Sequence, residues 1–398
     1  MTATGAIPPS PLGATPFAYE SRECENCGSS RQEELWAYSH DVKTRHRLFR
    51  FDVRNVICRD CGFVFVSPVP SAASLQGYYA DAYSAPASQL PDYDVERRLA
   101  CIDSAGPRRR LLVEVGSNQQ TAFHQRLASE FQRVVTVELN EGVSADCRSL
   151  ADVEPGSADV VAHYFVLEHV TAVGQFLGDC ARVLAADGVM IVEVPDLAIY
   201  PADPVALGNF EHMNHFSRGM LDSLAALSGF APIDVARNLC SRPFGMVAAY
   251  RKDANAGRHA MGGQGYDDNK RLFLAGFETL DRMRQALARS WTLVEKYQAL
   301  GRAIVFWGAN EMMDRFLGGR LPGPGVTVVD SDPLKAGFSR EFAVHTPAAA
   351  ADAVRQSSAI FLFTKLHSAA ILADLRMRFG KTYAADAIHI VDYMSANA

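Results

Sequence analysis

The sequence predicts an α/β protein with a small cysteine-rich module near its amino-terminal end, a central doubly wound sheet and a smaller nucleotide-type fold near its carboxyl-terminal end. Three observations support this class: two Cys-x-x-Cys pairs, alternating apolar and helical stretches from Leu111 to Pro195, and a second alternation that begins near residue 303. Apolar runs that alternate with helices are typical of doubly wound sheets, in which ligands bind at the carboxyl ends of the strands.

Composition places the chain among globular proteins. Its 398 residues are 48% hydrophobic, which is enough for a sizeable core, and the length favours two or three domains. A net charge of −6 with mixed signs excludes a strongly basic nucleic-acid surface, and no apolar run approaches the length of a membrane span. We expect a disordered tail (1–18), a cysteine-rich module (19–70), a central domain (71–250), a helical connection (251–300) and a small domain (301–398).

Four cysteines form two knuckles in the first module. Cys24 and Cys27 are one pair, Cys58 and Cys61 are the other, and each pair is followed by glycine. Four thiolates at this spacing favour a closed tetrahedral site for structural zinc, because a catalytic zinc keeps one position open. A redox or disulfide pair is the alternative, and a reducing compartment argues against it. The amino-terminal stretch lacks the charged start and apolar core of a secretion signal, so we expect a cytoplasmic protein with a zinc ribbon.

The central sheet is expected to begin with two strands that end at informative residues. The run 111–115 ends at Gly116, where a helix can begin, and the run 134–137 ends at the acid Glu138. Further elements are expected as a strand at 158–162 that ends near Tyr164, a helix at 173–184 and a strand at 189–194. This alternation predicts a parallel sheet with helices on both faces.

These residues resemble the class I S-adenosylmethionine-dependent methyltransferases. The resemblance is carried by Glu114-Val115-Gly116, by Glu138 and by the run from Phe165 to Val170. In that family the glycine-rich first turn admits the methionine part of the cofactor, and the acid after the second strand accepts hydrogen bonds from both ribose hydroxyls. The resemblance implies that S-adenosylmethionine is held by Glu114, Gly116, Asn118, Glu138 and Tyr164.

Two segments depart from that family. The first turn reads Ser117-Asn118-Gln119-Gln120-Thr121, where the family places a second glycine, so Gln119 and Gln120 are expected to crowd the cofactor site. After Glu138 the chain is too short for a full helix and a return to the sheet. We therefore expect a rebuilt wall on the adenine side.

The segment from Leu75 to Tyr83 resembles a narrower group, the zinc-containing sugar C-methyltransferases of deoxysugar biosynthesis. Members of that group carry a cysteine-rich module, a methyltransferase core and a second nucleotide-type fold. The resemblance implies that tyrosines of this segment, Tyr79 among them, reach the sugar. The alternative is that Tyr78, Tyr79 and Tyr83 pack on the core.

The stretch from Asn209 to Ser217 resembles the Tyr-Glu-His-x-x-x-Phe-Ser signature of the same group, which aligns His212 with its proposed base. Attaching a methyl group to carbon requires removal of the proton next to a ketone. Imidazole has a pKa near neutrality and can take that proton, while Glu211 orients it or binds the sugar. In the structural alternative, Ser217 caps a helix at 218–227 and His215 packs ahead of it.

The last third of the chain predicts a long helix and then a small Rossmann-like domain. Apolar residues recur at three- and four-residue steps from Asp267 to Leu300, and strands are expected at 303–307, 326–330, 359–364 and 388–391. Only the first glycine of the dinucleotide fingerprint is present, at Gly308. By resemblance, this domain helps to hold the nucleotide part of a nucleotide-linked sugar, with strand-end candidates Asp330, Lys365 and His367.

The leading prediction is an enzyme that transfers methyl from S-adenosylmethionine to a carbon of a nucleotide-linked keto-deoxysugar, with His212 as base. Two alternatives stay open: an isomerase or other enolate-forming enzyme that has lost methyl transfer, and a non-catalytic binding protein. The altered first turn and the short segment after Glu138 favour the enolate-forming alternative, whereas Glu138 argues against it. Loss of the glycine also fits a binding protein, but the Glu211-His212 pair does not. The sugar, the nucleotide and the oligomeric state are not specified by the sequence.

Overall fold

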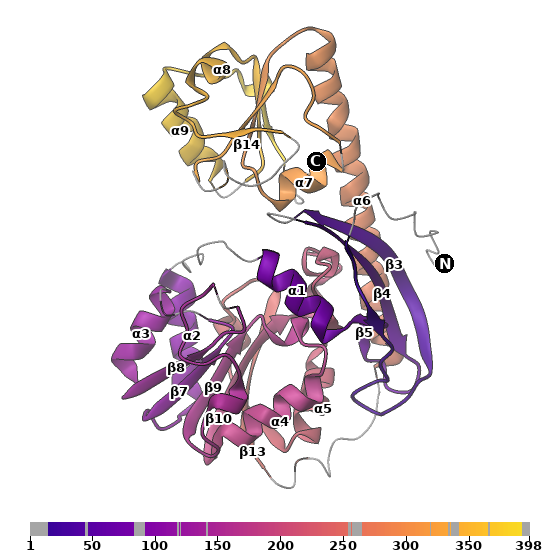
Figure 1. Cartoon of the computed structure of the whole chain (residues 1–398), viewed down its shortest axis with the longest axis vertical. Helices are drawn as coiled ribbons and strands as arrows, with labels where there is room; N and C mark the ends of the chain where they lie inside the picture. The colour runs from indigo at the N-terminus through magenta and orange to yellow at the C-terminus, as the bar shows by residue number, and fades with distance from the viewer. Residues whose placement is uncertain are drawn as a thin grey trace. The chain divides into compact units, whose positions relative to one another are not determined.

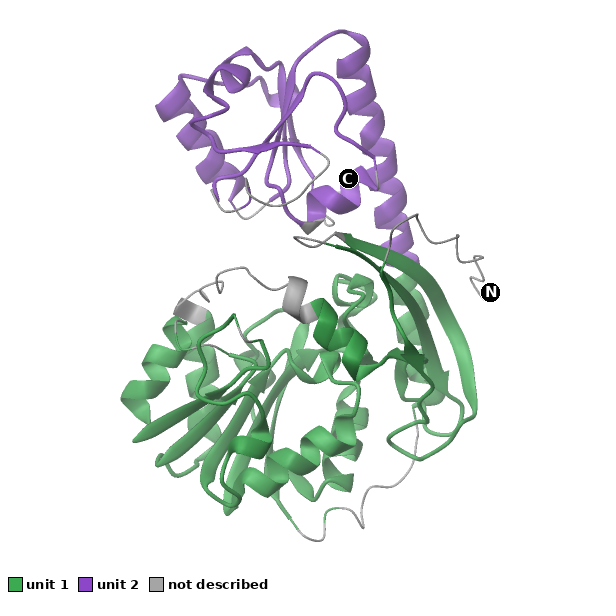
Figure 2. Ribbon diagram, viewed as in Figure 1, with its two compact units in different colours: residues 1–42, 47–277 green, residues 43–46, 278–398 purple. Residues whose placement is uncertain are grey.

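A computed structural model describes residues 15–43, 47–82, 92–117, 119, 121–140, 142–253, 256, 265–318, 320–332, 335, 342–364 and 367–391. The chain divides into two compact units, one made of residues 1–42 and 47–277 and the other of residues 43–46 and 278–398 (Figure 2). The long helix α6 (Tyr266–Ala299) contains the boundary between them, where the sequence predicts a helical connection.

The first unit is built on a six-stranded sheet with the order β12-β13-β10-β9-β7-β8. Its strands are β7 (Leu111–Val115), β8 (Arg133–Val137), β9 (Ala158–Tyr164), β10 (Leu184–Pro195), β12 (Phe230–Ile233) and β13 (Gly245–Lys252). Strands β7 to β10 pair in parallel, as the sequence predicts, whereas β13 pairs antiparallel to both β10 and β12. The sheet is therefore mixed rather than wholly parallel, and the antiparallel neighbours β12 and β13 need no helical crossover between them.

Helices cover both faces of this sheet (Figure 1). Helices α2 (Asp92–Ala105) and α3 (Ala122–Glu130) pack on one face, and α4 (Val173–Val183) and α5 (Arg218–Leu227) pack on the other. Successive strand residues point to opposite faces of the sheet. Leu112 therefore packs in the core with α2 and α3, and Val113 packs in the core with α4 and α5. Both faces of the parallel strands are therefore buried.

The cysteine-rich segment joins a second sheet of the same unit. Its strands are β1 (Thr15–Pro16), β3 (Gln32–Lys43), β4 (Leu48–Cys58), β5 (Val64–Val66) and β11 (Asn214–His215), and β2 (Tyr19–Glu20) pairs with β6 (Val69–Pro70) beside them. Phe17 is buried, so the tail predicted over 1–18 overlaps folded residues. Cys24, Cys58 and Cys61 share one hydrophobic core with the central sheet, and the module is thus continuous with the domain that follows.

The remaining elements of the first unit are short. Helix α1 spans Ala72–Ala82, and single helical turns lie at η1 (Leu150–Asp152), η2 (Leu167–His169), η3 (Leu197–Ile199), η4 (Ala206–Gly208) and η5 (Arg237–Leu239). In the part of the chain that the structure describes, no helix combines the length and the apolar character needed to cross a bilayer.

The second unit contains a parallel sheet with the order β16-β15-β14-β17-β18. Its elements are β14 (Ile304–Trp307), β15 (Val326–Val329), β16 (Val344–His345), β17 (Ala359–Leu362), β18 (Ile388–Ile390), α7 (Glu311–Leu317), α8 (Ala351–Gln356), α9 (Ser368–Phe379) and η8 (Ala385–Ala387). Four of these strands lie where the sequence predicts them. Strand β16 has only two residues, too few to give an apolar pattern.

Candidate functional site

The first turn after β7 requires glycine at position 116. Gly116 has φ +75°, and a Cβ placed there would lie 2.4 Å from Cγ2 of Val166, the residue that precedes η2. Its N–H donates to Val137 O of β8 over 2.9 Å. Any side chain would therefore strain the backbone and collide with Val166. Gly116 thus brings the first turn into direct contact with the turn that carries Glu168 and His169.

We expect Gly116→Ala to weaken binding of S-adenosylhomocysteine at least about tenfold, because the collision with Val166 must displace one of the two turns. A left-handed backbone costs an alanine roughly 1–2 kcal/mol in addition. Gly156→Ala is the matched control, since Gly156 has φ +67° but no atom within 4 Å of the added Cβ. Isothermal titration of both variants separates the two effects, and equal affinities would show that the contact with Val166 is unimportant.

Two buried polar atoms at the ends of β7 and β9 match the requirements of a bound ligand. Glu114 is 2% exposed, and its Oε2 has no hydrogen-bond partner among the described residues, the nearest group being His124 Nδ1 at 3.6 Å. The Glu114 carboxylate raises the pKa of His124. The hydroxyl of buried Tyr164 likewise has no partner there, while Arg98 Cζ lies 3.9 Å from its ring centroid. A ligand that donates and accepts hydrogen bonds would satisfy both atoms.

The segment after Glu138 is rebuilt as the sequence predicts. The described part of 138–149 contains no helix, and Cys147 returns to form an isolated parallel bridge with Val137, so β8 is the edge of the sheet. Arg148 Nη1 donates to the carbonyl oxygens of Glu138, Asn140 and Val143 over 2.8–3.1 Å. One carboxylate oxygen of Glu138 accepts the N–H of Asn140 over 2.8 Å. A compact, hydrogen-bonded loop therefore replaces the usual helix beside the predicted ribose site.

The Gln119 side chain is hydrogen-bonded to this loop. Its Nε2 donates to Asp146 Oδ1 over 2.9 Å, and its Oε1 accepts from Ser144 Oγ over 3.0 Å. The amide thereby ties the first turn to the adenine-side wall. Asn118 and Gln120 lie outside the described residues, so the predicted role of Asn118 and the predicted crowding by Gln120 stay predictions.

The turn after β9 starts from an unusual backbone conformation. Phe165 has φ +57°, the only positive value at a non-glycine position in the described part of the chain, and its N–H donates to Glu193 O over 2.8 Å. A bulky residue in this region stores strain, and such residues cluster at functional sites. The bend at Phe165 directs the chain over Gly116 and into η2, which presents Glu168 and His169.

A cluster of acidic and imidazole side chains forms where η2 meets residues 211–213. His169 Nδ1 lies 3.1 Å from Glu211 O, and its Nε2 lies 3.9 Å from Glu168 Oε1. The rings of His169 and His212 meet edge to face with centroids 4.8 Å apart. His212 is 7% exposed, and Tyr78 OH donates to Glu211 Oε1 over 3.0 Å. The structure thus brings the predicted Glu211-His212 pair together with a second Glu-His pair.

Desolvation favours the uncharged forms of that second pair, with the Glu168 side chain 1% exposed and the His169 side chain 27% exposed. Desolvation raises the pKa of Glu168 to about 8 and lowers the pKa of His169 to about 4. Glu168 is 1% exposed, and neither of its carboxylate oxygens has a hydrogen-bond partner among the described residues. At pH 7 the pair therefore consists of a protonated carboxyl and a neutral imidazole. A carbonyl acceptor for Nδ1–H leaves the lone pair of His169 on Nε2, toward Glu168.

Glu168, His169 and His212 each offer one potential metal-ligand atom within 4.8 Å of the others. His169 Nε2 and Glu168 Oε1 lie 3.9 Å apart, and burial favours the protonated form of Glu168. A protonated Glu168 carboxyl can donate a hydrogen bond but offers no negative charge to a metal ion. We therefore interpret the cluster as acid–base groups.

The four cysteines of the first module fit zinc. Their Sγ atoms all lie within 4.8 Å of one another, with Cys24 and Cys61 3.3 Å apart and Cys27 and Cys58 3.5 Å apart. Zinc bound to four thiolates at about 2.3 Å would place the sulfurs about 3.8 Å apart. The structure thus brings together the predicted metal ligands, three of them buried. Four protein ligands would close the site and give the metal a structural role.

The other predicted residues have structural roles or lie outside the described side chains. His215 is 2% exposed and contacts Tyr200 OH at 2.8 Å and Asn55 Oδ1 at 2.9 Å, which agrees with its predicted packing role. Tyr79 lies in α1, but its side chain is not among those described; Tyr78 is the tyrosine that contacts Glu211. Ser217 begins α5 without a side-chain cap.

In the second unit, Asp330 directly follows β15, and its carboxylate contacts residues of the same unit. Its Oδ2 accepts the N–H of Ala309 over 2.7 Å and lies 2.9 Å from Lys335 Nζ. His367 is exposed before α9, and Lys365 lies outside the described residues. The acid that follows the second strand of this sheet therefore already has protein partners.

Sequence reasoning missed the contact between His169 and Glu211-His212. His169 lies in η2, and its separation of more than 40 residues from His212 in the sequence hides their proximity in the fold. A repeated dipeptide was the available signal, because Glu-His occurs at both 168–169 and 211–212.

Comparison with known proteins identifies the central sheet. A family model described as a methyltransferase domain matches residues 112–192. A probable S-adenosylmethionine-dependent methyltransferase of Mycolicibacterium smegmatis is 26% identical over 200 residues, which cover 50% of this chain and 60% of that protein. A probable S-adenosylmethionine-dependent methyltransferase of Mycobacterium tuberculosis is 25% identical over 235 residues, which cover 58% of this chain and 68% of that protein. The match to the first relative thus spans less than two thirds of its length.

A structural match was found to 1,6-didemethyltoxoflavin-N1-methyltransferase of Burkholderia thailandensis, solved with 1,6-didemethyltoxoflavin and S-adenosylhomocysteine. It is 16% identical and has a TM-score of 0.35, over 48% of this chain and 96% of that chain. Residues 112–192 of the chain therefore match a methyltransferase domain, and the curated relatives to which the chain is similar are probable S-adenosylmethionine-dependent methyltransferases.

Proposed function

We propose that this protein methylates a carbon atom next to the keto group of a nucleotide-linked deoxysugar, with S-adenosylmethionine as donor and His212 as base. The observation that supports it best is the position of the Glu168–His169–His212 cluster. Its turn packs through Val166 on Gly116, the glycine of the predicted cofactor turn. Methyl donor and base are therefore expected to act at the same end of the sheet.

The residues present fit the cofactor. Glu138 follows β8, where the family holds ribose. Glu114 Oε2 and the Tyr164 hydroxyl, which have no hydrogen-bond partner in the described part of the chain, lie at the ends of β7 and β9. S-adenosylmethionine, when bound, supplies an electrophilic methyl group. The described part of the loop at 138–149 stands where the family has a helix and would form the adenine-side wall. The Gln119 side chain is hydrogen-bonded to this loop.

In this proposal His212 starts the reaction. Its imidazole would accept the proton from the carbon beside the ketone, which leaves an enolate whose carbon forms the new bond to methyl. The carbon–hydrogen bond is replaced by a carbon–carbon bond, the methyl–sulfur bond of the donor would break to leave S-adenosylhomocysteine, and the proton would pass from His212 to solvent. Tyr78 holds Glu211, the neighbour of His212, and the Glu211 carbonyl holds His169. General base catalysis of this kind typically contributes ~10²–10⁴-fold.

Nucleotide-linked keto-deoxysugars are the substrates to test first, with methyl-labelled S-adenosylmethionine as donor. The proposal predicts a labelled methyl group on a sugar carbon, detected by carbon NMR of the product. Solvent deuterium incorporation without methyl transfer would instead indicate an enolate-forming enzyme that has lost the second step. Sugar binding with neither reaction would indicate a binding protein. Methylation on oxygen or nitrogen would contradict the role of His212.

A further inference from the structure

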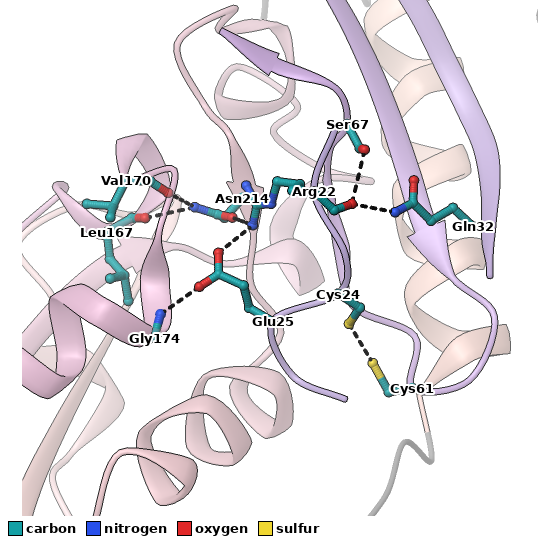
Figure 3. Close-up of polar contacts among 10 residues, drawn as sticks. All are labelled: Arg22, Cys24, Glu25, Gln32, Cys61, Ser67, Leu167, Val170, Gly174 and Asn214. Carbon is teal, nitrogen blue, oxygen red and sulfur yellow. Dashed lines mark hydrogen bonds and ion pairs between the residues drawn. The ribbon is translucent and has the colours of Figure 1, made fainter. Parts of the chain in front are cut away.

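Asn214 ties the two ends of the η2 turn together. It is 1% exposed in β11, and its Nδ2 donates to Leu167 O over 3.0 Å and to Val170 O over 2.7 Å (Figure 3). Its Oδ1 accepts from Arg22 Nη2 over 2.8 Å. Both amide hydrogens and the amide oxygen are thus engaged. The backbone beside it adds a further link, because Met213 N donates to Glu168 O over 2.7 Å.

Arg22 and Glu25 connect this turn to the cysteine knuckle. They flank Cys24 in sequence, and Arg22 Nη2 also lies 3.1 Å from Glu25 Oε1. The other carboxylate oxygen of Glu25 accepts the N–H of Gly174, in the first turn of α4, over 2.7 Å. Figure 3 shows this path from Cys24 through Arg22 and Asn214 to the turn.

Arg22, which lies beside the knuckle, is itself held in place by several contacts. Arg22 O accepts from Gln32 Nε2 over 2.8 Å and from Ser67 Oγ over 3.4 Å, and its guanidinium lies 4.8 Å from the centroid of the Phe65 ring. The Arg22 side chain is only 9% exposed. A buried charged hydrogen bond of this type is stronger than a neutral one, and losing one partner leaves the other unsatisfied.

From this path we propose that the cysteine knuckle positions the acid–base cluster, and that Arg22 and Asn214 are the positioning residues that transmit its geometry to Glu168 and His169. The proposal rests on the proposed function, which assigns the cluster its role. It gives the metal site a purpose beyond folding: Arg22 lies two residues before Cys24 in the knuckle, Arg22 holds Asn214, and Asn214 holds both ends of the turn.

The test uses histidine titration by NMR on the full-length zinc-loaded protein, so that no substrate is needed. The His169 signal is assigned by its absence from His169→Gln. Burial lowers the pKa of His169 to about 4 in the intact turn. In Asn214→Leu and in Arg22→Gln the turn loosens and water enters, so this pKa should rise by at least about one unit toward the ordinary 6.5.

Zinc content and affinity for S-adenosylhomocysteine should stay within about twofold of the parent in both variants. Ser223→Ala is the matched control. It removes a 2.7 Å hydrogen bond from Ser223 Oγ to Asn26 Oδ1, which joins the same knuckle to α5 rather than to η2, and it should leave the His169 titration unchanged. If Asn214→Leu fails to fold, Arg22→Gln still gives a result, because it removes the 2.8 Å hydrogen bond to Asn214 Oδ1 and leaves the Asn214 side chain itself unchanged.

An unchanged His169 pKa in folded Arg22→Gln would overturn the proposal, as would an equal shift in Ser223→Ala. Failure of the proposed function is detected separately, as absence of methyl transfer by the parent protein, and does not alter the histidine titration. For an active parent, a shifted His169 accompanied by lower kcat at constant KM for S-adenosylmethionine would complete the support.

Discussion

Replacing His212 with Gln is expected to lower methyl transfer and proton exchange at the sugar carbon by roughly 10²–10⁴-fold, the usual contribution of a general base. Glutamine is of similar size and forms hydrogen bonds, but it cannot accept the proton. Because the side chain is largely buried at 7% exposure, a polar replacement should preserve the packing against His169. Binding of sugar nucleotide and of S-adenosylhomocysteine should stay nearly intact, and solvent deuterium exchange measures the lost step.

His215→Gln is the matched control for this experiment. His215 is also buried, at 2% exposure, but its ring nitrogens contact Tyr200 OH and Asn55 Oδ1, and burial lowers its pKa to about 3, so it is neutral at pH 7. This variant should lose thermal stability while the folded fraction exchanges protons normally. Normal exchange in His212→Gln, or loss of exchange in His215→Gln alone, would exclude His212 as the base.

Replacing Cys58 with Ser is expected to abolish zinc binding and to unfold the first unit. Structural zinc contributes roughly 10–16 kcal/mol in small zinc modules, which matches or exceeds the whole stability of a typical domain. The sequence suggests that metal loss would unfold the amino-terminal module alone. Cys24, Cys58 and Cys61, however, share a core with the central sheet, so we expect the module and the methyltransferase domain to unfold together.

Cys180→Ser provides the matched control, because Cys180 is fully buried in the same core but is not one of the four clustered cysteines. It should cost a few kcal/mol of stability for a buried hydroxyl and keep the metal. Elemental analysis and circular dichroism report the two outcomes. A folded Cys58→Ser protein without metal would contradict the structural zinc site.

The sequence predicts the elements whose signals are local. Apolar runs that end at Gly116 and Glu138 correspond to β7 and β8, and the periodic stretch from Asp267 corresponds to α6. The short segment after Glu138 also predicts correctly that a helix is missing, because chain length alone excludes it. The paired cysteines meet because each knuckle is a local turn and both lie within one small module.

Contacts across long sequence separations could not be predicted. Arg22 and Asn214 are separated by 192 positions, and nothing in either local sequence indicates that β11 joins the sheet of the cysteine module. The antiparallel strands β12 and β13 were missed for a similar reason, since their pairing depends on a return of the chain rather than on a helix between them. The second Glu-His pair had a visible sequence signal, but only the fold shows that it meets the first.

The central claim is that the altered first turn still holds the methyl donor, and isothermal titration of the purified protein with S-adenosylhomocysteine tests it most directly. Gly116 is the glycine that the turn requires, and Gln119 is tied to the neighbouring wall. The account predicts a micromolar Kd, about −8 kcal/mol. Absence of detectable binding to S-adenosylhomocysteine and to S-adenosylmethionine would contradict it.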